Sequence, residues 1–153
     1  MIQCVFENGS TNSLRHVTVG CIMLNSRNEI LLAKRSMNLL EAGKWCLLGG
    51  YMERDETTVE CCIREAEEES GWTIKNIQLL RFNDNPNRPK EDRQNVEFVY
   101  FAQVDKLVGI PDDESSELKW FKLDQLPNED EMAFDHLDNI DVYKDKYWTK
   151  AQS

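Results

Sequence analysis

Apolar and β-branched residues recur along the chain in short runs separated by turn-forming residues, a pattern typical of strands joined by tight connections. Two such runs occupy residues 16–24 and 29–34, and residues 25–28 between them (Asn-Ser-Arg-Asn) have turn chemistry. These runs predict a β-hairpin. Residues 1–13 lead into it, with a turn at residues 8–10 (Asn-Gly-Ser), and predict a short edge strand.

The segment from Thr57 onwards changes to a helical pattern. Thr57 and Glu60 form a capping box, in which the hydroxyl and the carboxylate satisfy backbone N–H groups of the first turn. Gly71 marks the end of the helix, because glycine tolerates the left-handed conformation just past the last turn. At about 100° per residue, an apolar stripe expected to face the core contains Val59, Cys62, Ile63 and Ala66, and a neighbouring acidic stripe contains Glu65, Glu68 and Glu69.

The second half of the chain continues the strand pattern and closes with a helix. Residues 73–82 predict a strand, and residues 95–104 predict a second strand whose two faces are both apolar, so we expect it to lie centrally in the sheet. Residues 118–123 predict a further strand. Residues 131–147 carry apolar side chains at three-residue intervals and predict an amphipathic helix. Together these elements predict an α/β fold with a mixed sheet between helices.

Composition narrows the function classes. At 153 residues with 41% hydrophobic side chains, the chain is expected to form a single domain, residues 1–153. The net charge of −10 argues against a nucleic-acid polymer or an anionic membrane as partner. No apolar run approaches the roughly 18–20 residues of a membrane span, and no basic signal-peptide region opens the sequence, so we expect a cytoplasmic protein. Five cysteines without Cys-x-x-Cys spacing favour reduced, buried thiols.

Negative charge is concentrated between Glu53 and Glu69, where eight acidic residues accompany two basic ones. A charge run of this kind is usually a solvated surface, and like charges at helical spacing cost roughly 0.2–0.5 kcal/mol per pair. The surrounding pattern favours a binding site instead. Two glycines precede the helix, a glutamate follows the second glycine by six residues, and an Arg-Glu pair follows that glutamate by eight.

This pattern resembles the Nudix box, G-x5-E-x7-R-E-U-x-E-E-x-G-U, in which U is an apolar residue. Two further segments are similar to the family. Residues 45–50 resemble its W-x-L-P-G-G sequence, with Leu48 where proline is usual, and residues 120–127 resemble its W-F-x-L-D-x-L-P close. The resemblance covers about residues 16–147. The residues that match the box are Gly50, Glu56, Arg64, Glu65, Ala66, Glu68, Glu69, Gly71 and Trp72.

The resemblance implies a Nudix-type α/β/α sandwich with a mixed β-sheet and a loop-helix-loop box. It also implies a phosphoric anhydride hydrolase that depends on Mg²⁺, with Mn²⁺ as a substitute. By resemblance, Glu68, Glu69 and the carbonyl of Gly49 would bind metal, and Glu65 would be a ligand or the group that takes a proton from water. Arg64 and Glu56 are expected to pair and to hold the loop on the helix. A further metal contact is expected from Glu114 or, with less weight, Glu117.

The substrate is less well defined than the reaction. The resemblance places Arg35 near substrate phosphates, although a basic strand end also fits. The loop 83–94 carries Arg88 and Arg93, which we take as candidate substrate contacts; a hairpin tip with solvated charges fits equally well. ADP-ribose, a nucleotide sugar and a (d)NTP all remain open as small-molecule substrates. A non-catalytic Nudix-fold module that senses a nucleotide is the alternative, and both a monomer and a homodimer are compatible with the sequence.

Overall fold

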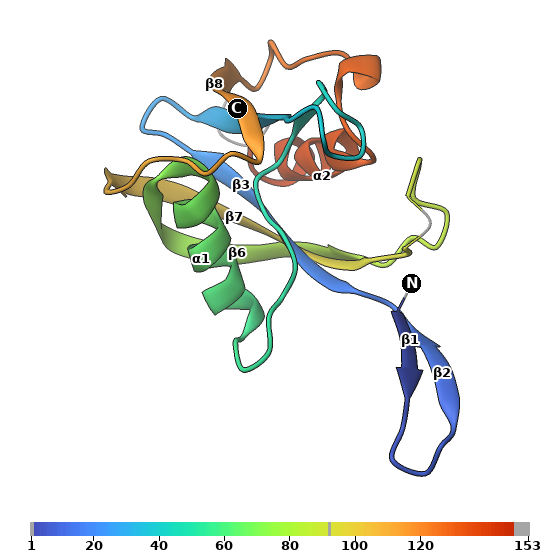
Figure 1. Ribbon diagram of the computed structural model, residues 1–153. Coiled ribbons are helices and arrows are strands. Elements are labelled where there is room, and N and C mark those ends of the chain that lie inside the picture. Colours follow the sequence, from blue (N-terminus) through green and yellow to red (C-terminus); the bar gives the residue numbers. More distant parts are fainter. Residues whose placement is uncertain (1, 92, 149–153) are drawn as a thin grey trace.

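The computed structural model describes residues 2–91 and 93–148, and its centre is a mixed six-stranded sheet (Figure 1). Five strands follow the order β5-β4-β3-β7-β6, and β8 also pairs with β4. β3 and β7 run parallel, while the β3–β4, β4–β8 and β6–β7 pairs are antiparallel. The strands are β3 (Val17–Leu24), β4 (Glu29–Arg35), β5 (Trp45–Cys46), β6 (Trp72–Asn83), β7 (Val96–Leu107) and β8 (Ser115–Lys122).

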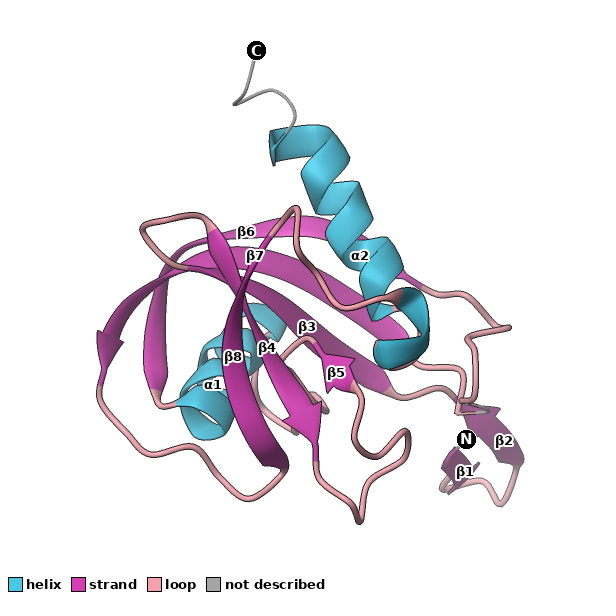
Figure 2. Ribbon diagram, turned by 90° about the horizontal axis from the view of Figure 1, so that it is seen from above, coloured by secondary structure: helices cyan, strands magenta, loops and turns pink. Residues whose placement is uncertain are grey.

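One helix covers each face of the sheet (Figure 2), which confirms the α/β/α sandwich. Successive residues of β3 point to opposite faces, as the pleat requires. On one face, Val19, Cys21 and Met23 pack in one core cluster with residues of α1 (Thr58–Ser70). On the other, Ile22 and Leu24 pack in a second cluster with residues of α2 (His136–Tyr143). The predicted central strand is β7, which lies between β3 and β6.

The predicted hairpin of β3 and β4 is confirmed, but its strands pair over two residue pairs only, Met23–Leu31 and Leu24–Ile30. Beyond these pairs the strands diverge, and residues 48–52 pair with the earlier part of β3. Val19 N–H donates to Gly50 O at 2.9 Å, and Cys21 N–H donates to Leu48 O at 2.8 Å. Because β3 and β4 diverge, residues 48–52 can pair with β3, and this pairing fixes the backbone of Gly49 and Gly50 beside the sheet, directly ahead of α1.

α1 has the predicted ends. The Thr57 side chain accepts from Glu60 N–H while the Glu60 carboxylate accepts from Thr57 N–H, and Gly71 has φ 73°. The predicted core stripe is wrong in part, because Val59 is 41% exposed and Ile63 is 38% exposed. The buried face turns instead towards the glycine loop, where Cys61 packs with its Sγ 3.6 Å from Tyr51 O. The buried residues of the helix are Cys61, Cys62, Ala66, Glu69 and Ser70.

The closing helix begins later than predicted. A short 3₁₀ turn, η1 (Glu129–Glu131), precedes it, and the segment after that turn lies beside β5, with Ala133 N–H donating to Trp45 O at 2.8 Å. Phe134 then takes the left-handed conformation, φ 51°, which interrupts a helix. α2 therefore starts at His136, and the π-helical turn η2 (Lys144–Trp148) extends it.

The N-terminal segment differs from the prediction as well. Instead of an edge strand of the main sheet it forms a separate two-stranded hairpin, β1 (Ile2–Val5) and β2 (Thr11–Leu14), which projects from the body of the protein (Figure 1). Residue 1 of the predicted segment lies outside the described residues. Neither helix within the described ranges has the length and apolar content needed to span a membrane.

Candidate active site

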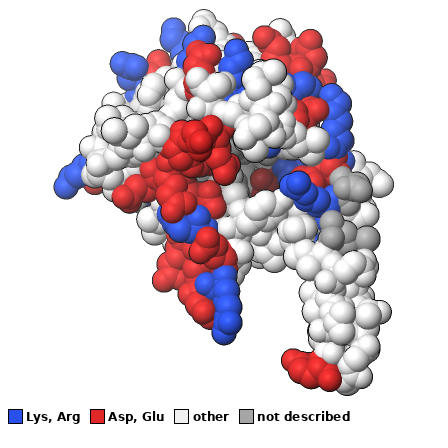
Figure 3. All heavy atoms as spheres, in the orientation of Figure 1, with Lys and Arg blue, Asp and Glu red and all other residues white. Residues whose placement is uncertain are grey.

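A pocket of about 580 Å³ opens between the glycine loop, α1, the start of β3 and the loop before β7. Eight carboxylates and four guanidinium groups line it, so its charge is strongly negative. Figure 3 shows acidic side chains gathered over the position of α1 and continuing beside a hollow. The carboxylates belong to Glu53, Glu65, Glu68, Glu69, Glu91, Glu97, Asp112 and Glu114, and the guanidinium groups to Arg35, Arg64, Arg88 and Arg93.

Glu69 lies deepest of the three glutamates of the predicted acidic stripe. Its side chain is buried, and Oε2 accepts a hydrogen bond from Gly49 N–H at 2.7 Å. Burial raises the pKa of Glu69 to about 8, and the Gly49 N–H opposes that shift only in part. A buried carboxylate with no cationic partner among the contacts described is expensive to ionise, so a nearby cation would stabilise its charged form.

Glu65 packs directly against the second glycine of the loop. A Cβ atom added to Gly50 would lie 2.6 Å from Glu65 Oε1 and 2.7 Å from Cδ, so only a residue without a side chain leaves room for this carboxylate. Burial raises the pKa of Glu65, and the neighbouring Arg64 opposes the shift. The glycine therefore serves to bring a half-buried carboxylate close to the backbone of the loop.

Arg64 ties this carboxylate to the rest of the site. It donates to both oxygens of Glu56, at 2.8 and 3.1 Å, to Glu65 at 2.8 Å, to Glu68 at 3.0 Å and to the Tyr51 carbonyl at 3.1 Å. The Arg64 guanidinium lowers the pKa of Glu56 to about 2, with help from the Glu53 N–H. The predicted Arg64–Glu56 pair is confirmed, and it holds the loop on the helix.

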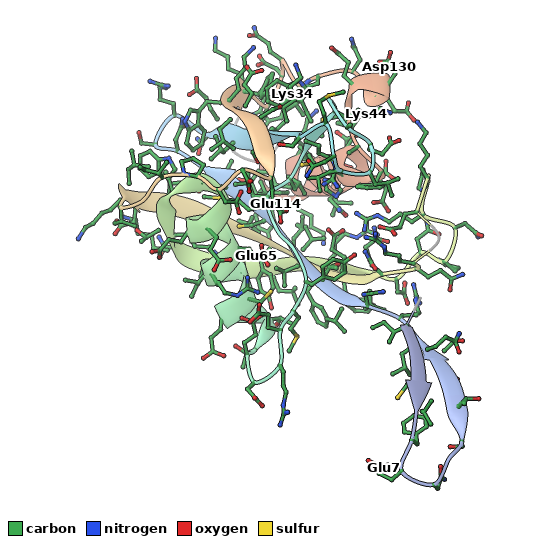
Figure 4. The ribbon with its side chains drawn as sticks, viewed as in Figure 1. Glu7, Lys34, Lys44, Glu65, Glu114 and Asp130 are labelled. Atoms are coloured by element: carbon green, nitrogen blue, oxygen red, sulfur yellow. The ribbon has the colours of Figure 1, made fainter. Side chains whose placement is uncertain are left out.

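Two further groups face the same pocket. The Glu68 side chain is 55% exposed, which leaves it open to solvent and to a ligand. Glu114 lies on the segment before β8, and Ser36 N–H donates to its carbonyl at 3.0 Å; Figure 4 labels Glu114 near Glu65 of α1. Glu117, the less favoured residue for this position, instead lies 3.8 Å from Lys34 and does not line the pocket.

The residues at this end of the pocket fit a divalent cation with hard oxygen ligands. Arg64 uses one oxygen of Glu65 and one of Glu68, so the second oxygen of each has no described partner. Gly49 presents its backbone beside Glu69. Over residues 2–91 and 93–148, no three His, Cys, Asp or Glu side chains already lie close enough to hold an ion. Binding would therefore draw these carboxylates together.

The three arginines expected to contact substrate all line the pocket, in different settings. Arg35 donates from Nε to Leu40 O at 2.6 Å and lies 5.2 Å from the ring of Phe134. Arg88 is buried and pairs with Asp135 at 2.7 Å and with Glu97 at 3.4 Å, so its guanidinium is already engaged. Arg93 is exposed and reaches Tyr51 Oη at 2.5 Å. One residue of the same loop, Asp92, lies outside the described residues.

A buried polar network that also lines the pocket was largely missed by sequence reasoning. Glu97 and His136 are both buried, with Glu97 Oε1 3.9 Å from His136 Nε2, and Gly20 has no side chain where it faces Glu97. Burial lowers the pKa of His136 to about 3, assisted by the positive charge of Arg88. His136 is therefore neutral, and its Nδ1 accepts from Leu47 N–H at 2.9 Å. Glu97 within an otherwise apolar strand was the available signal.

Comparison with known proteins places this site in a family. The family model for the NUDIX domain matches residues 14–142. An ADP-ribose pyrophosphatase of Methanocaldococcus jannaschii is 34% identical over 123 residues, which cover 79% of this chain and 69% of that protein. A NAD-capped RNA hydrolase, NudC, of Photobacterium profundum is 31% identical over 110 residues, but the chain spans only 39% of its length.

Solved structures agree with the described fold. A NUDIX hydrolase from Nitrosomonas europaea is 26% identical, with a TM-score of 0.76 over 97% of this chain and 87% of that one. The NUDIX domain of Shewanella oneidensis NrtR, solved in complex with ADP ribose, has a TM-score of 0.71 over 87% of this chain and 88% of that one. At 24% identity, the second likeness concerns the fold alone.

Proposed function

Because the chain belongs to the NUDIX family, we propose that it is a metal-dependent pyrophosphohydrolase that cleaves the phosphoric anhydride of a nucleoside diphosphate linked to another group. The observation that carries this proposal is the acidic end of the pocket. Three glutamates of one helix turn, Glu65, Glu68 and Glu69, line it together, and their only described cationic partner is Arg64. Such a charge would repel a diphosphate unless a cation accompanied it.

We propose Glu65, Glu68, Glu69, Glu114 and the Gly49 carbonyl as the groups that would hold Mg²⁺, with Mn²⁺ as a substitute. Bound there, the ion would offset the carboxylate charge and polarise the phosphoryl oxygen and the attacking water. The oxygen-only donor set supports this choice of metal. The raised pKa of Glu69 also supports it, because a buried carboxylate of this kind needs a positive charge to stay ionised.

The protein groups have separate tasks in the proposed reaction. Glu65 is proposed to serve either as a metal ligand or as the group that receives the proton of the attacking water, and its raised pKa and partial burial suit the second task. Arg64 positions Glu65 and Glu68 and, through Glu56, keeps the loop closed on α1. Arg35 and Arg93 are proposed to contact the substrate phosphates at the rim of the pocket. Arg88 is proposed to act on the substrate phosphates from the buried wall of the pocket, because Asp135 and Glu97 already bind its guanidinium.

ADP-ribose is the first substrate to test. A relative that shares 34% identity with this chain is named an ADP-ribose pyrophosphatase, and several others are named NAD-capped RNA hydrolases. Both names refer to an adenosine diphosphate joined to a second group. Nucleotide sugars and (d)NTPs share the anhydride. The net charge of −10 favours small nucleotides over a nucleic-acid polymer, and we propose that the protein acts on them in the cytoplasm.

The decisive experiment is a substrate panel. Purified protein with Mg²⁺ is incubated with ADP-ribose, NAD⁺, nucleotide sugars and dNTPs, and the products are separated by chromatography. We expect cleavage between the two phosphates of at least one compound. A protein that binds one of them, measured by calorimetry, yet releases no product with Mg²⁺ or Mn²⁺, would be a nucleotide sensor, and the proposed hydrolysis would be wrong.

A further inference from the structure

The same pocket contains a second group of polar side chains, which we call the acceptor corner: Thr18, Tyr51, Glu91, Arg93 and Asn95. Thr18 lies in β3 and forms an isolated bridge with Tyr51, the residue after Gly50. Glu91, Arg93 and Asn95 come from the loop between β6 and β7. The corner is therefore continuous with the proposed catalytic end of the same pocket.

Three buried oxygen atoms in this corner have no hydrogen-bond partner. Within residues 2–91 and 93–148, Thr18 Oγ1, Glu91 Oε1 and Asn95 Oδ1 are buried without a hydrogen-bond partner, and their residues are 7%, 8% and 6% exposed. The fourth such atom in these ranges belongs to Asn139 of α2. Glu91 Oε1 forms an ion pair with Arg93 Nε, at 3.7 Å. Buried polar atoms are normally paired, because each unpaired one destabilises the fold. Because the three residues all line one pocket, we take these atoms as evidence for a polar ligand that pairs with them.

The neighbouring carboxylate fixes which way the Asn95 amide turns. Asn95 Nδ2 donates to Glu91 Oε2 at 3.3 Å. With the amide reversed, its oxygen would face that carboxylate oxygen and both would be acceptors, which is unfavourable. Asn95 Oδ1 must therefore point away from Glu91 as an acceptor. The other oxygen of Glu91, Oε1, lies 3.7 Å from Arg93 Nε, beyond hydrogen-bond distance.

A flat apolar surface adjoins these acceptors. The Tyr51 ring is 42% exposed and lies 5.1 Å from the His16 ring. Arg93 lies 6.0 Å from the Tyr51 ring and hydrogen-bonds its hydroxyl at 2.5 Å, so the ring is held in place. Tyrosine rings commonly stack on nucleobases, with no preference for one base. The Tyr51 ring therefore provides a surface on which a base can stack, and the acceptors distinguish one base from another.

We infer that the acceptor corner binds a nucleobase with an exocyclic amine, adenine in the first place, as the base of the nucleotide hydrolysed by the proposed function on which this inference rests. An exocyclic amine offers two N–H donors, which match the two acceptors Glu91 Oε1 and Asn95 Oδ1. The Thr18 hydroxyl can donate to the adjacent ring nitrogen of adenine. A base with a carbonyl at that position, such as hypoxanthine, would set an acceptor against both oxygens.

The test compares AMP with IMP, which differ in carrying an amine or a carbonyl at the same ring carbon. Their dissociation constants are measured by titration calorimetry with Mg²⁺ for the wild type, Glu91→Gln and the control Glu7→Gln. The control substitution makes the same chemical change as Glu91→Gln, but Glu7 lies at the tip of the projecting hairpin, far from the pocket (Figure 4). We expect the wild type and the control to bind AMP roughly 5- to 100-fold more tightly than IMP.

In Glu91→Gln the dissociation constants of AMP and IMP should differ by no more than about threefold, because the new amide can turn an N–H towards the carbonyl of IMP. Thr18→Val, which removes a hydroxyl at nearly constant shape, should weaken AMP binding, because the ring nitrogen of adenine loses its donor. It provides a second readout should Glu91→Gln unfold, as judged by circular dichroism. Equal binding of AMP and IMP by the wild type, or binding of neither, would overturn the inference.

The same measurements separate this inference from the proposed function. Preference for AMP in a protein that cleaves nothing in the substrate panel would leave the corner standing and remove the hydrolase. Cleavage of ADP-ribose and its hypoxanthine analogue at equal kcat/KM, with equal binding of AMP and IMP, would support the proposed hydrolysis and contradict the role of the acceptor corner. Displacement of AMP by ribose 5-phosphate, with no effect of the amine, would assign the corner to sugar hydroxyls and contradict the inference.

Discussion

Gly50→Ala tests the geometry of the proposed site, because the structure predicts a large loss of activity with little change in stability. The new Cβ would lie 2.6 Å from Glu65 Oε1, and ordinary contact begins near 3.4 Å, so the carboxylate must move by about 0.8 Å. Gly50 is not among the glycines with positive φ, so alanine fits its backbone. The atoms in conflict lie at the far end of a flexible side chain, and they can move without disturbing the core.

The expected effect on catalysis is large. A displacement of about 1 Å in a catalytic group costs roughly 100-fold in rate, so kcat for the best substrate of the panel should fall by about that factor. The free energy of unfolding should change by less than about 1 kcal/mol, since alanine also restricts the unfolded chain. Steady-state kinetics and urea unfolding measure the two quantities.

Gly109→Ala is the matched control. Its added Cβ would meet only Gly71 Cα at 3.6 Å, an ordinary contact, and its φ is not positive. Both its kcat and its stability should remain close to wild type. A Gly50→Ala enzyme with kcat within twofold of wild type would refute the placement of Glu65 in the proposed site. Equal losses of activity and of folded protein would refute the claim that the side chain alone moves.

Three further results are expected. Glu68→Gln should lower kcat by several orders of magnitude with unchanged circular dichroism, whereas wild-type turnover would remove Glu68 from the proposed metal site. Mg²⁺ at 100 times its Kd should stabilise the wild type by about 2.7 kcal/mol in urea unfolding and should stabilise Glu68→Gln less, and identical shifts would count against the assigned ligands. His136, whose pKa falls from 6.5 to about 3 on folding, stays neutral in the native state while the unfolded chain takes up a proton below pH 6.5. His136 therefore contributes a loss of stability of about 2 kcal/mol between pH 6.5 and pH 5, while Glu69, whose pKa is raised on folding, contributes an opposite change. The loss is measured as the difference in pH dependence between the wild type and His136→Gln, and an equal pH dependence of the two proteins would show that His136 is not responsible.

Local chemistry explains which parts of the fold the sequence predicts well. The two ends of α1 follow from a capping box and a glycine, both of which act within a few residues. The pairing of Arg64 with Glu56 follows from the resemblance to the Nudix box and is confirmed by a 2.8 Å contact. The acidic stripe also lies where helical spacing places it, because Glu65, Glu68 and Glu69 line one pocket.

The errors arise where contacts distant in sequence decide the structure. Val59 and Ile63 remain exposed because α1 is covered on the side of Cys61 by the glycine loop, which the helical period cannot reveal. α2 begins late because the Ala133 N–H donates a hydrogen bond to the carbonyl of Trp45, far away in the sequence, and because Phe134 takes a left-handed conformation. For loop 83–94 a substrate contact and a hairpin tip with solvated charges were equally open, and the second is wrong for Arg88, which is buried through its pairs with Asp135 and Glu97.

The acceptor corner was out of reach for the same reason. Thr18, Glu91 and Asn95 carry no motif, and their significance depends on burial without partners, which only coordinates reveal. Loop 83–94 was expected to help to identify the substrate, and the corner takes Glu91 and Arg93 from it. The roles of these residues in recognition, like those of Glu65, Glu68, Glu69 and Glu114 in metal binding, stay predictions.

The most direct test of the central claim is the release of AMP and ribose 5-phosphate from ADP-ribose, followed by chromatography, with Mg²⁺ and with excess EDTA. Hydrolysis of a phosphoric anhydride at the acidic end of the pocket predicts both products with Mg²⁺, neither with EDTA, and almost none from Glu68→Gln. Should ADP-ribose stay intact, the other compounds of the panel are assayed in the same way. Folded protein that cleaves no anhydride with Mg²⁺ or Mn²⁺, or that cleaves equally well in EDTA, would contradict the account.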